Sequence, residues 1–177
     1  MSTTEPSAAR IRRAGPADAA LLAELGARTF HETFAADNRP EDMAAYLASA
    51  FSVEQTEREL SDPRSIWLVA EIDGAAAGYA KLYAGAAPEC VRGPDPVELA
   101  RIYAARAWLG RGVGALLLRA CLEEARRGGH RTIWLGVWER NERARAFYRK
   151  WDFRDAGTQI FQLGSDTQTD VVMEREL

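Results

Sequence analysis

Hydrophobic residues recur with a helical period in the first third of the chain. A short strand over 10–14 is expected to precede helices over 16–30, from 41 onward and over 52–60, where apolar residues return every three or four positions. The stretch TFHETFAADNRP, residues 29–40, interrupts this period and predicts a turn between the first two helices.

The middle of the chain changes to the pattern of extended strands. SIWLVAEIDG (65–74) and AAAGYAKLYAG (75–85) predict a hairpin closed by an Asp-Gly turn. APECVRGPDP (87–96) is rich in Pro and Gly and predicts a loop, and VELARIYAA (97–105) predicts the next strand. After a predicted helix over 112–129, the almost unbroken apolar run RTIWLGVW (131–138) is typical of a strand covered on both faces.

The end of the chain is expected to add a last helix over 138–153 and two strands over 153–164 and 170–177. Two central strands are thus joined through a helix, which predicts a parallel crossover. The predicted fold class is α/β, in the sense of an α+β mixed sheet flanked by helices. We expect a single domain over 10–177 after a flexible N-terminal tail over 1–9.

Composition narrows the class of protein. A chain of 177 residues, 47% of them hydrophobic, suits one domain with a sizeable core. The net charge of -3, with both signs interspersed, argues against a nucleic-acid partner, which would need a clustered basic face. No apolar stretch approaches the ~20 residues that span a bilayer, and the N-terminus lacks a signal-peptide pattern. We therefore expect no membrane partner and a cytoplasmic location.

The two cysteines, Cys90 and Cys121, belong to no CxxC pair, and no His/Cys cluster has zinc spacing. Free cysteines are usually small buried hydrophobes, so both are expected to be buried thiols. The sequence predicts no metal site.

The loop AWLGRGVGALLL holds Gly110, Gly112 and Gly114 between a predicted strand and a predicted helix. Glycines let a backbone approach a ligand closely, and the free N–H groups and dipole of a helix N-terminus favour a phosphate there. Arg111 adds a cation. The alternative, a tight turn without a ligand, stays open on this loop alone. A Walker run is absent, and a dinucleotide fold would continue with more alternating strands and helices.

The segment WERNERARAFYRKWDF (138–153) places several non-charged residues on one face of a helix: Asn141, Ala144, Phe147, Tyr148 and Trp151. Tyr148 can be a core aromatic whose hydroxyl reaches a polar partner. Alternatively, with a pKa near ~10, its hydroxyl holds a proton at neutral pH that it could donate in a reaction. Asn141 also suits a helix N-cap.

Together, ELARIYAARAWLGRGVGALLL (98–118) and TIWLGVWERNERARAFYRKWDF (132–153) resemble the acyl-CoA-binding core of the GCN5-related N-acetyltransferases, the GNAT family. The resemblance extends over about 10–177. WLGVWERN and the C-terminal run from 161 look more narrowly like the PaiA-type polyamine acetyltransferases. The resemblance implies the GNAT acyl-CoA N-acyltransferase fold, a mixed sheet splayed between the strands at 97–105 and 131–138. It also implies acetyl-CoA as cosubstrate, bound in that wedge.

The resemblance further implies a set of cofactor-binding residues. The pantetheine arm would pair with the strand backbone at Ile102, Tyr103 and Ala104, and Asn141 would contact the arm. The pyrophosphate would lie on the glycine loop, which consists of Gly110, Arg111, Gly112, Val113, Gly114 and Ala115. In the family this strand usually carries a bulge, which frees an N–H to point at the thioester carbonyl. One well-placed hydrogen bond to the developing oxyanion can be worth ~3 kcal/mol.

Two positions depart from the family pattern. Leu109 replaces the Gln or Arg that often lies three residues before the middle glycine of the loop, which removes a side-chain contact but not the backbone cradle. Asp152 replaces a glycine before Phe153. Asp tolerates the left-handed conformation better than most residues, so the turn is expected to form.

Amide formation from a thioester needs a neutral amine, so an alkylamine with a pKa near ~10.4 must first lose a proton. Glu98, at the start of the cofactor strand, is the candidate base, acting directly or through water, with Tyr103 and Glu139 in reserve. A solvated carboxylate at a strand end is the alternative for Glu98. Tyr148 matches the family's tyrosine near the cofactor sulfur and is the candidate acid for the leaving thiolate.

The acceptor is expected to bind among the early helices, the TFHETF turn and the loop over 85–96, with His31 and Glu32 as candidate lining residues. The predicted activity is acetyl transfer to a primary amine of a small molecule, and polyamines such as spermidine or spermine are the first candidates. The alternatives are a protein N-terminus or lysine as acceptor, or a non-catalytic CoA-binding regulatory module. A homodimer through the late strands is a further hypothesis.

Overall fold

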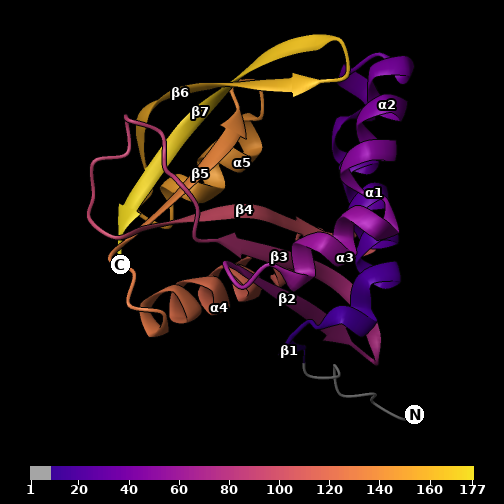
Figure 1. The fold of residues 1–177 in the computed structure, drawn as a ribbon, viewed down its shortest axis with the longest axis horizontal. Helices are drawn as coiled ribbons and strands as arrows, with labels where there is room; N and C mark the ends of the chain where they lie inside the picture. Colours follow the sequence, from indigo (N-terminus) through magenta and orange to yellow (C-terminus); the bar gives the residue numbers. More distant parts are fainter. Residues whose placement is uncertain (1–8) are drawn as a thin grey trace.

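Seven strands join into one mixed sheet in the order β1-β2-β3-β4-β5-β7-β6, in a computed structural model that describes residues 9–177 (Figure 1). The strands are β1 (Arg10–Arg13), β2 (Ser65–Ile72), β3 (Ala75–Tyr83), β4 (Pro96–Ala104), β5 (Thr132–Trp138), β6 (Arg154–Leu163) and β7 (Asp166–Glu176). The α-helices are α1 (Ala19–Phe34), α2 (Pro40–Ala50), α3 (Val53–Ser61), α4 (Val113–Arg127) and α5 (Glu142–Arg149). The predicted fold class, a mixed α/β sheet flanked by helices, is confirmed.

The pairing between β4 and β5 is parallel and very short. These strands are joined through α4, as predicted, and only three residue pairs connect them, ending at Glu98 opposite Trp134. β4 nevertheless continues to Ala104 and β5 to Trp138. The two strands therefore separate over their second halves, and Figure 1 shows them diverging toward α1 and α2.

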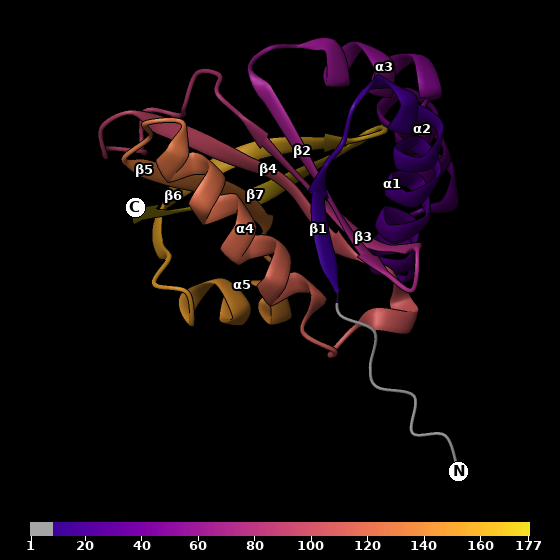
Figure 2. The ribbon, with the colours of Figure 1, turned by 90° about the horizontal axis from the view of Figure 1, so that it is seen from below.

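Helices cover both faces of the sheet because successive residues of each strand point to opposite sides. Leu68 of β2 belongs to the core cluster that includes Leu117 and Cys121 of α4. Its neighbour Trp67 belongs instead to a cluster with Leu22 of α1. Figure 2 shows α4 on one side of β1 to β3 and the helices α1 to α3 on the other. The sheet thus has an α4 face and an α1 face.

A β-bulge in β4 changes which side chains point to each face. Leu99 pairs with Leu82 and Arg101 with Lys81, so Ala100 between them has no partner on β3. Before the bulge, Leu99 packs on the α4 face, and after it Ile102 does so as well. In a strand that alternated regularly without a bulge, Ile102 would be three positions after Leu99 and would point to the α1 face.

α1 continues to Phe34, so the prediction of a turn beginning at residue 29 is wrong. The hydroxyl of Thr29 donates to the carbonyl of Leu25 at 2.8 Å, and that of Thr33 donates to the carbonyl of Thr29 at 2.7 Å. These bonds to the preceding turn satisfy polar side chains within the helix. His31 and Glu32 therefore lie on a helix, and a short 3-10 turn over Ala35–Asp37 follows it.

The last helix is shorter than predicted. Trp138 ends β5, and α5 begins after Asn141, whose side-chain oxygen accepts the N–H of Ala144 at 3.2 Å. The sequence pattern could not separate a strand end, a cap and a helix within one run of charged and aromatic residues. Asp152, with φ of 65°, adopts the left-handed conformation expected of it where the chain turns into β6.

The cysteine prediction is correct for one residue. Cys121 is buried, and burial raises the pKa of its thiol to about 12. Cys90 is free but only partly buried, because it lies in the loop before β4.

Within residues 9–177, no helix is long and apolar enough to cross a membrane. The same residues contain no group of three or more His, Cys, Asp or Glu side chains that could hold a metal ion. The predicted tail over 1–9 falls, except for residue 9, outside the described residues.

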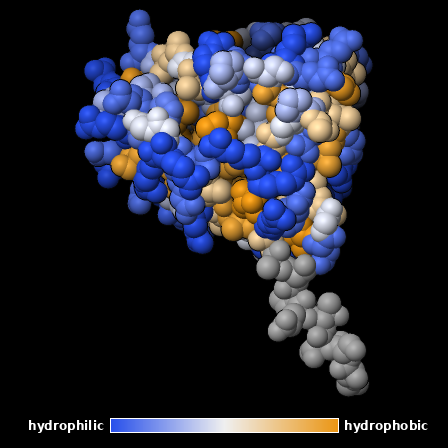
Figure 3. Space-filling model, turned by 60° about the horizontal axis from the view of Figure 1, so that its bottom comes forward, coloured by the Kyte–Doolittle hydropathy of each residue, from blue (hydrophilic) through white to orange (hydrophobic). Residues whose placement is uncertain are grey.

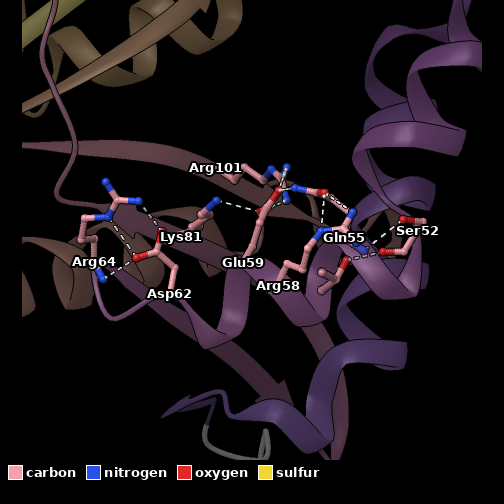
Figure 4. Close-up of polar contacts among 9 residues, drawn as sticks. Ser52, Gln55, Arg58, Glu59, Asp62, Arg64, Lys81 and Arg101 are labelled. Carbon is pink, nitrogen blue, oxygen red and sulfur yellow. Dashed lines mark hydrogen bonds and ion pairs between the residues drawn. The ribbon is translucent and has the colours of Figure 1, made fainter.

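One carboxylate attaches α3 to the sheet by pairing with two cations (Figure 4). Glu59 lies 2.7 Å from Lys81 Nζ of β3 and 3.2 Å from Arg101 Nη1 of β4, and all three side chains are more than four-fifths buried. Burial opposes ionisation of Glu59, but the charges of Arg101 and Lys81 outweigh it and hold its pKa below the ordinary value. Ser52 caps this helix by accepting the N–H of Gln55 at 3.1 Å.

Replacing Glu59 with Gln should lower the free energy of unfolding by about 3 kcal/mol at pH 7, because two buried cations lose their counter-charge. Denaturant unfolding would measure the difference. The difference should shrink as the pH falls from 4.5 toward the lowered pKa of the folded state, below which the wild-type carboxylate is protonated too. Glu57→Gln, the same change at an exposed position of the same helix, is the control and should have almost no effect. Equal losses in both variants would contradict the importance of this cluster.

Candidate active site

The separation of β4 and β5 opens a cavity of about 690 Å³. It is bounded by residues 98–104 of β4 and 136–138 of β5, and it reaches the glycine loop and α5 at one end. At the other end it is lined by residues of α1, α2, β6 and β7. On the face drawn in Figure 3, a band of hydrophobic residues is visible between hydrophilic ones.

The glycine loop has the backbone geometry of an anion site. Gly110 and Gly112 have φ of 74° and 83°, in the left-handed region that favours glycine, and a Cβ on either would meet nothing within 4 Å. Gly112 immediately precedes α4, and no side chain caps the first N–H groups of this helix. Those N–H groups and the helix dipole suit a phosphate, so this loop fits the pyrophosphate of acetyl-CoA.

The six predicted residues of the loop do not contribute in the same way. Gly110, Gly112, Gly114 and Ala115 line the cavity. Val113 is buried in the core, so only its backbone can face a ligand, and Arg111 lies over the ring of Trp108 at 5.4 Å. For all six residues the contact with the cofactor stays a prediction.

The second half of β4 offers a free edge to the cavity. Ile102, Tyr103 and Ala104 all line it, as predicted, and no strand within residues 9–177 pairs with β4 on the β5 side beyond Glu98. Backbone N–H and C=O groups on such an edge can pair with an extended ligand, as the amide groups of a pantetheine arm would require. Asn141 also lines the cavity while it caps α5.

Tyr148 lines the cavity and is 9% exposed. Its ring packs edge-on against Phe147 and Phe153, at 5.4 Å and 5.6 Å between centroids, which fixes its direction. Burial raises the pKa of its hydroxyl, so the group stays protonated throughout the neutral range. Tyr148 is thus a packed aromatic whose hydroxyl carries its proton at neutral pH, and its role as the acid stays a prediction.

Glu98 lies in the cavity wall where β4 and β5 separate, and it is partly buried. Burial raises the pKa of Glu98, while the charges of Lys81 and Arg101 act in the opposite direction. An upward shift moves a carboxylate toward neutrality and makes it a stronger base.

The predicted acceptor-lining residues are only partly correct. Glu32 lines the cavity, and its carboxylate accepts the N–H of Arg106 at 3.1 Å. His31 is exposed and does not line the cavity, because residues 31 and 32 point in different directions from α1. Among the described residues, none of the loop 85–96 lines it either. The early helices instead contribute aromatic rings, from Phe30, Phe34, Tyr46 and Phe51.

The sequence missed the part of the cavity that β6 and β7 build. Two contacts join this hairpin to α2 and the segment before it. The N–H and hydroxyl of Ser165 both donate to Asp42 Oδ1 at 2.7 Å, and Gln168 Nε2 donates to Asn38 Oδ1 at 2.6 Å. The hairpin thereby closes the end of the cavity opposite the glycine loop, which we call the acceptor end.

Asp170 of β7 is the polar residue that sequence reasoning overlooked. It is 8% exposed and lines the cavity together with Gln159 of β6. Burial raises the pKa of Asp170 to about 6, against the effect of a hydrogen bond from Gln159. The sequence signal for Asp170 is that an acid begins the run DVVMEREL. An acid at that position also fits an ordinary strand end.

Comparison with known proteins places the chain in a family. Residues 27–153 match the Acetyltransferase (GNAT) family. An uncharacterized N-acetyltransferase of Mycobacterium tuberculosis is 37% identical over 161 residues, which cover 90% of this chain and 98% of that protein. The chain therefore belongs to the GNAT family of acetyltransferases.

Two solved structures illustrate the fold. The PaiA N-acetyltransferase from Thermoplasma acidophilum, in complex with coenzyme A, superimposes with a TM-score of 0.76 at 21% identity, over 96% of this chain and 99% of that one. The putative acetyltransferase YncA from Salmonella typhimurium, with acetyl-CoA, gives 0.67 at 26% identity, over 97% and 95%. The predicted enzyme class, an acetyl-CoA-dependent acyltransferase, and the cosubstrate acetyl-CoA are confirmed.

Gly114→Val tests the cofactor end of the cavity. Gly114 lines it, and a Cβ there would touch only Phe147, at 3.8 Å, so the protein itself should accept the side chain. The affinity for coenzyme A, measured by calorimetry, should fall at least ten-fold because the isopropyl group would occupy ligand space. Gly15→Val adds the same group in open space and should leave the affinity unchanged. Full affinity in Gly114→Val would place the cofactor elsewhere.

Asp170→Asn should stabilise the folded protein at neutral pH. The folded-state pKa of about 6 exceeds the ordinary 3.8, so wild-type stability from this group is complete below pH 3.8 and is lost as the pH rises through 6. The variant should therefore gain about 1 to 2 kcal/mol at pH 7 and little at pH 4. Urea unfolding at the two pH values measures this. A variant less stable than wild type at pH 7 would show that the carboxylate is paired after all.

Proposed function

We propose that this enzyme transfers the acetyl group of acetyl-CoA to a primary amine of a small molecule, and that polyamines such as spermidine or spermine are its acceptors. One observation supports this most strongly. A single cavity connects the glycine loop, the candidate acid Tyr148 and the candidate base Glu98 to a pocket with aromatic walls and a buried acid. Aromatic rings and carboxylates together suit alkylammonium groups.

The chain's own groups would first align the two substrates. The N–H groups at the start of α4 hold the pyrophosphate, and the free edge of β4 holds the extended arm between β4 and β5. Acetyl-CoA supplies an acetyl group activated as a thioester. The bulge at Ala100, two residues beyond Glu98, interrupts the regular pairing of β4 with β3. A backbone N–H there would stabilise the negative charge that develops on the carbonyl oxygen.

Glu98 would then take the proton from the acceptor's ammonium, directly or through water. Only the neutral amine has the lone pair needed to attack the carbonyl carbon. An alkylamine has a pKa near ~10.4, so this deprotonation is uphill at neutral pH. Burial raises the pKa of Glu98, which reduces the difference between the pKa of the amine and that of the base.

Tyr148 would protonate the sulfur as the carbon–sulfur bond breaks and the carbon–nitrogen bond forms. Thiols have a pKa of about 8.5, so the thiolate can leave without an acid, and a donor mainly accelerates its departure. A tyrosine whose pKa is raised is a weak acid but always carries its proton at pH 7.

The activity is tested by acetyl-CoA-dependent thiol release with spermidine, spermine, putrescine, simple arylamines and short peptides. Release with polyamines alone supports the proposal. Release with peptides alone would replace the acceptor by a protein N-terminus or lysine. Tight acetyl-CoA binding without release by any of them would favour a non-catalytic CoA-binding module.

Tyr148→Phe should lower kcat at least ten-fold and leave the affinity for acetyl-CoA almost unchanged, because only the hydroxyl is removed. Steady-state kinetics and calorimetry measure the two quantities. Tyr83→Phe, which removes a hydroxyl outside the cavity, is the control and should retain full activity. Unchanged turnover in Tyr148→Phe would eliminate this residue as the acid.

A further inference from the structure

A buried carboxylate without a counter-charge lies at the acceptor end of the cavity. Asp170 is 8% exposed, and it takes part in none of the ion pairs among residues 9–177. Buried charges in proteins are normally paired, because removing them from water is costly. The amide of Gln159 is its polar neighbour, and an amide does not neutralise a carboxylate. Asp170 therefore suits a positively charged ligand.

Strand register places Asp170 and Glu98 on the same face of the sheet. Glu98 is opposite Trp134 of β5, whereas Asp170 is opposite Trp138 of the same strand. Positions 134 and 138 point to the same side, since side chains alternate along a strand. This is the α1 face, because the ring of Trp138 packs against Phe34 of α1 at 6.1 Å.

The two carboxylates are separated along that face. The levels of Glu98 and Asp170 are four residue steps apart along β5, from Trp134 to Trp138, which is about 13 Å at the usual rise of a strand. Glu98 is also near the bulge at Ala100, where the reaction is proposed to occur, and Asp170 is not. One acceptor molecule could thus meet both carboxylates at different points of its length.

Gly136 keeps the cavity open between them. It lies midway between Trp134 and Trp138 and lines the cavity. A Cβ on Gly136 would be 2.4 Å from Gln159 Nε2 and 3.1 Å from Asp170 Oδ2. Even a methyl group would therefore displace the two polar side chains that face this space.

We infer that Asp170, supported by Gln159, binds a second cationic group of the acceptor, remote from the amine that is acetylated. This inference rests on the proposed function. A carboxylate that pairs with an ammonium keeps it protonated, and a protonated amine cannot attack the thioester. Asp170 therefore serves a nitrogen that stays charged during the reaction. The substrate class is an aliphatic diamine or polyamine, and monoamines lack the anchored group.

The test compares wild type and Asp170→Asn on putrescine, spermidine and butylamine, the monoamine that matches putrescine in carbon number. Wild type should use putrescine or spermidine at least ten-fold better than butylamine in kcat/KM. In Asp170→Asn, kcat/KM for the diamines should fall at least ten-fold, mainly through KM, while that for butylamine changes less than two-fold. Asp166→Asn, the same change at an exposed position of β7, should behave as wild type.

A second variant keeps the inference testable if Asp170→Asn does not fold. Gly136→Ala leaves the carboxylate in place but crowds it, so it should raise KM for putrescine at least five-fold and leave KM for butylamine nearly unchanged. A wild-type enzyme without preference for diamines would overturn the inference, as would equal losses on both amines in the variants.

Thermal unfolding separates this inference from the proposed function. If no amine is acetylated, the proposed function fails, yet spermidine should still raise the unfolding temperature of wild type and not that of Asp170→Asn. The same stabilisation by spermidine in both proteins would show that Asp170 is not the anchor, whatever the activity.

Discussion

The separation of two neighbouring strands after three residue pairs determines the rest of this structure. β4 and β5 would gain further backbone hydrogen bonds by remaining parallel, and instead they diverge beyond Glu98 and Trp134. The cavity, the free edge of β4 and the access of α5 to the sheet all result from that divergence. The largest cluster of buried residues lies between α4 and the strands on its face.

Alternation along the strands then assigns different chemistry to the two faces. On the α4 face, Ile133, Leu135 and Val137 of β5 form an apolar core with α4. On the α1 face, Trp138 packs against Phe34, and Gly136 lies beside Gln159 and Asp170. The bulge at Ala100 changes which residues of β4 point to each face. Glu98 and Asp170 thus lie outside the main core, whereas Tyr148 belongs to it.

Sequence reasoning succeeded where structure is encoded in neighbouring residues. The glycine loop and the crossover through α4 belong to short stretches whose spacing is itself informative. Glu98 and Tyr148 line the cavity, and their roles as base and acid stay predictions. It failed for α1, which continues past the end of its hydrophobic period while the hydroxyls of Thr29 and Thr33 bond to the preceding turn. It also failed for Asp170, because only the register of three strands reveals that this acid is opposite Trp138 and beside Gln159.

The contacts that close the acceptor end join segments far apart in the chain. Asp42 binds Ser165, and Asn38 binds Gln168, across more than 120 residues, whereas the cofactor end lies within one stretch from β4 to α5. Long-range contacts of this kind form late in folding, since the loop they close must first be ordered. During synthesis, the residues of the cofactor end are therefore all available before β6 and β7, which line the opposite end of the cavity.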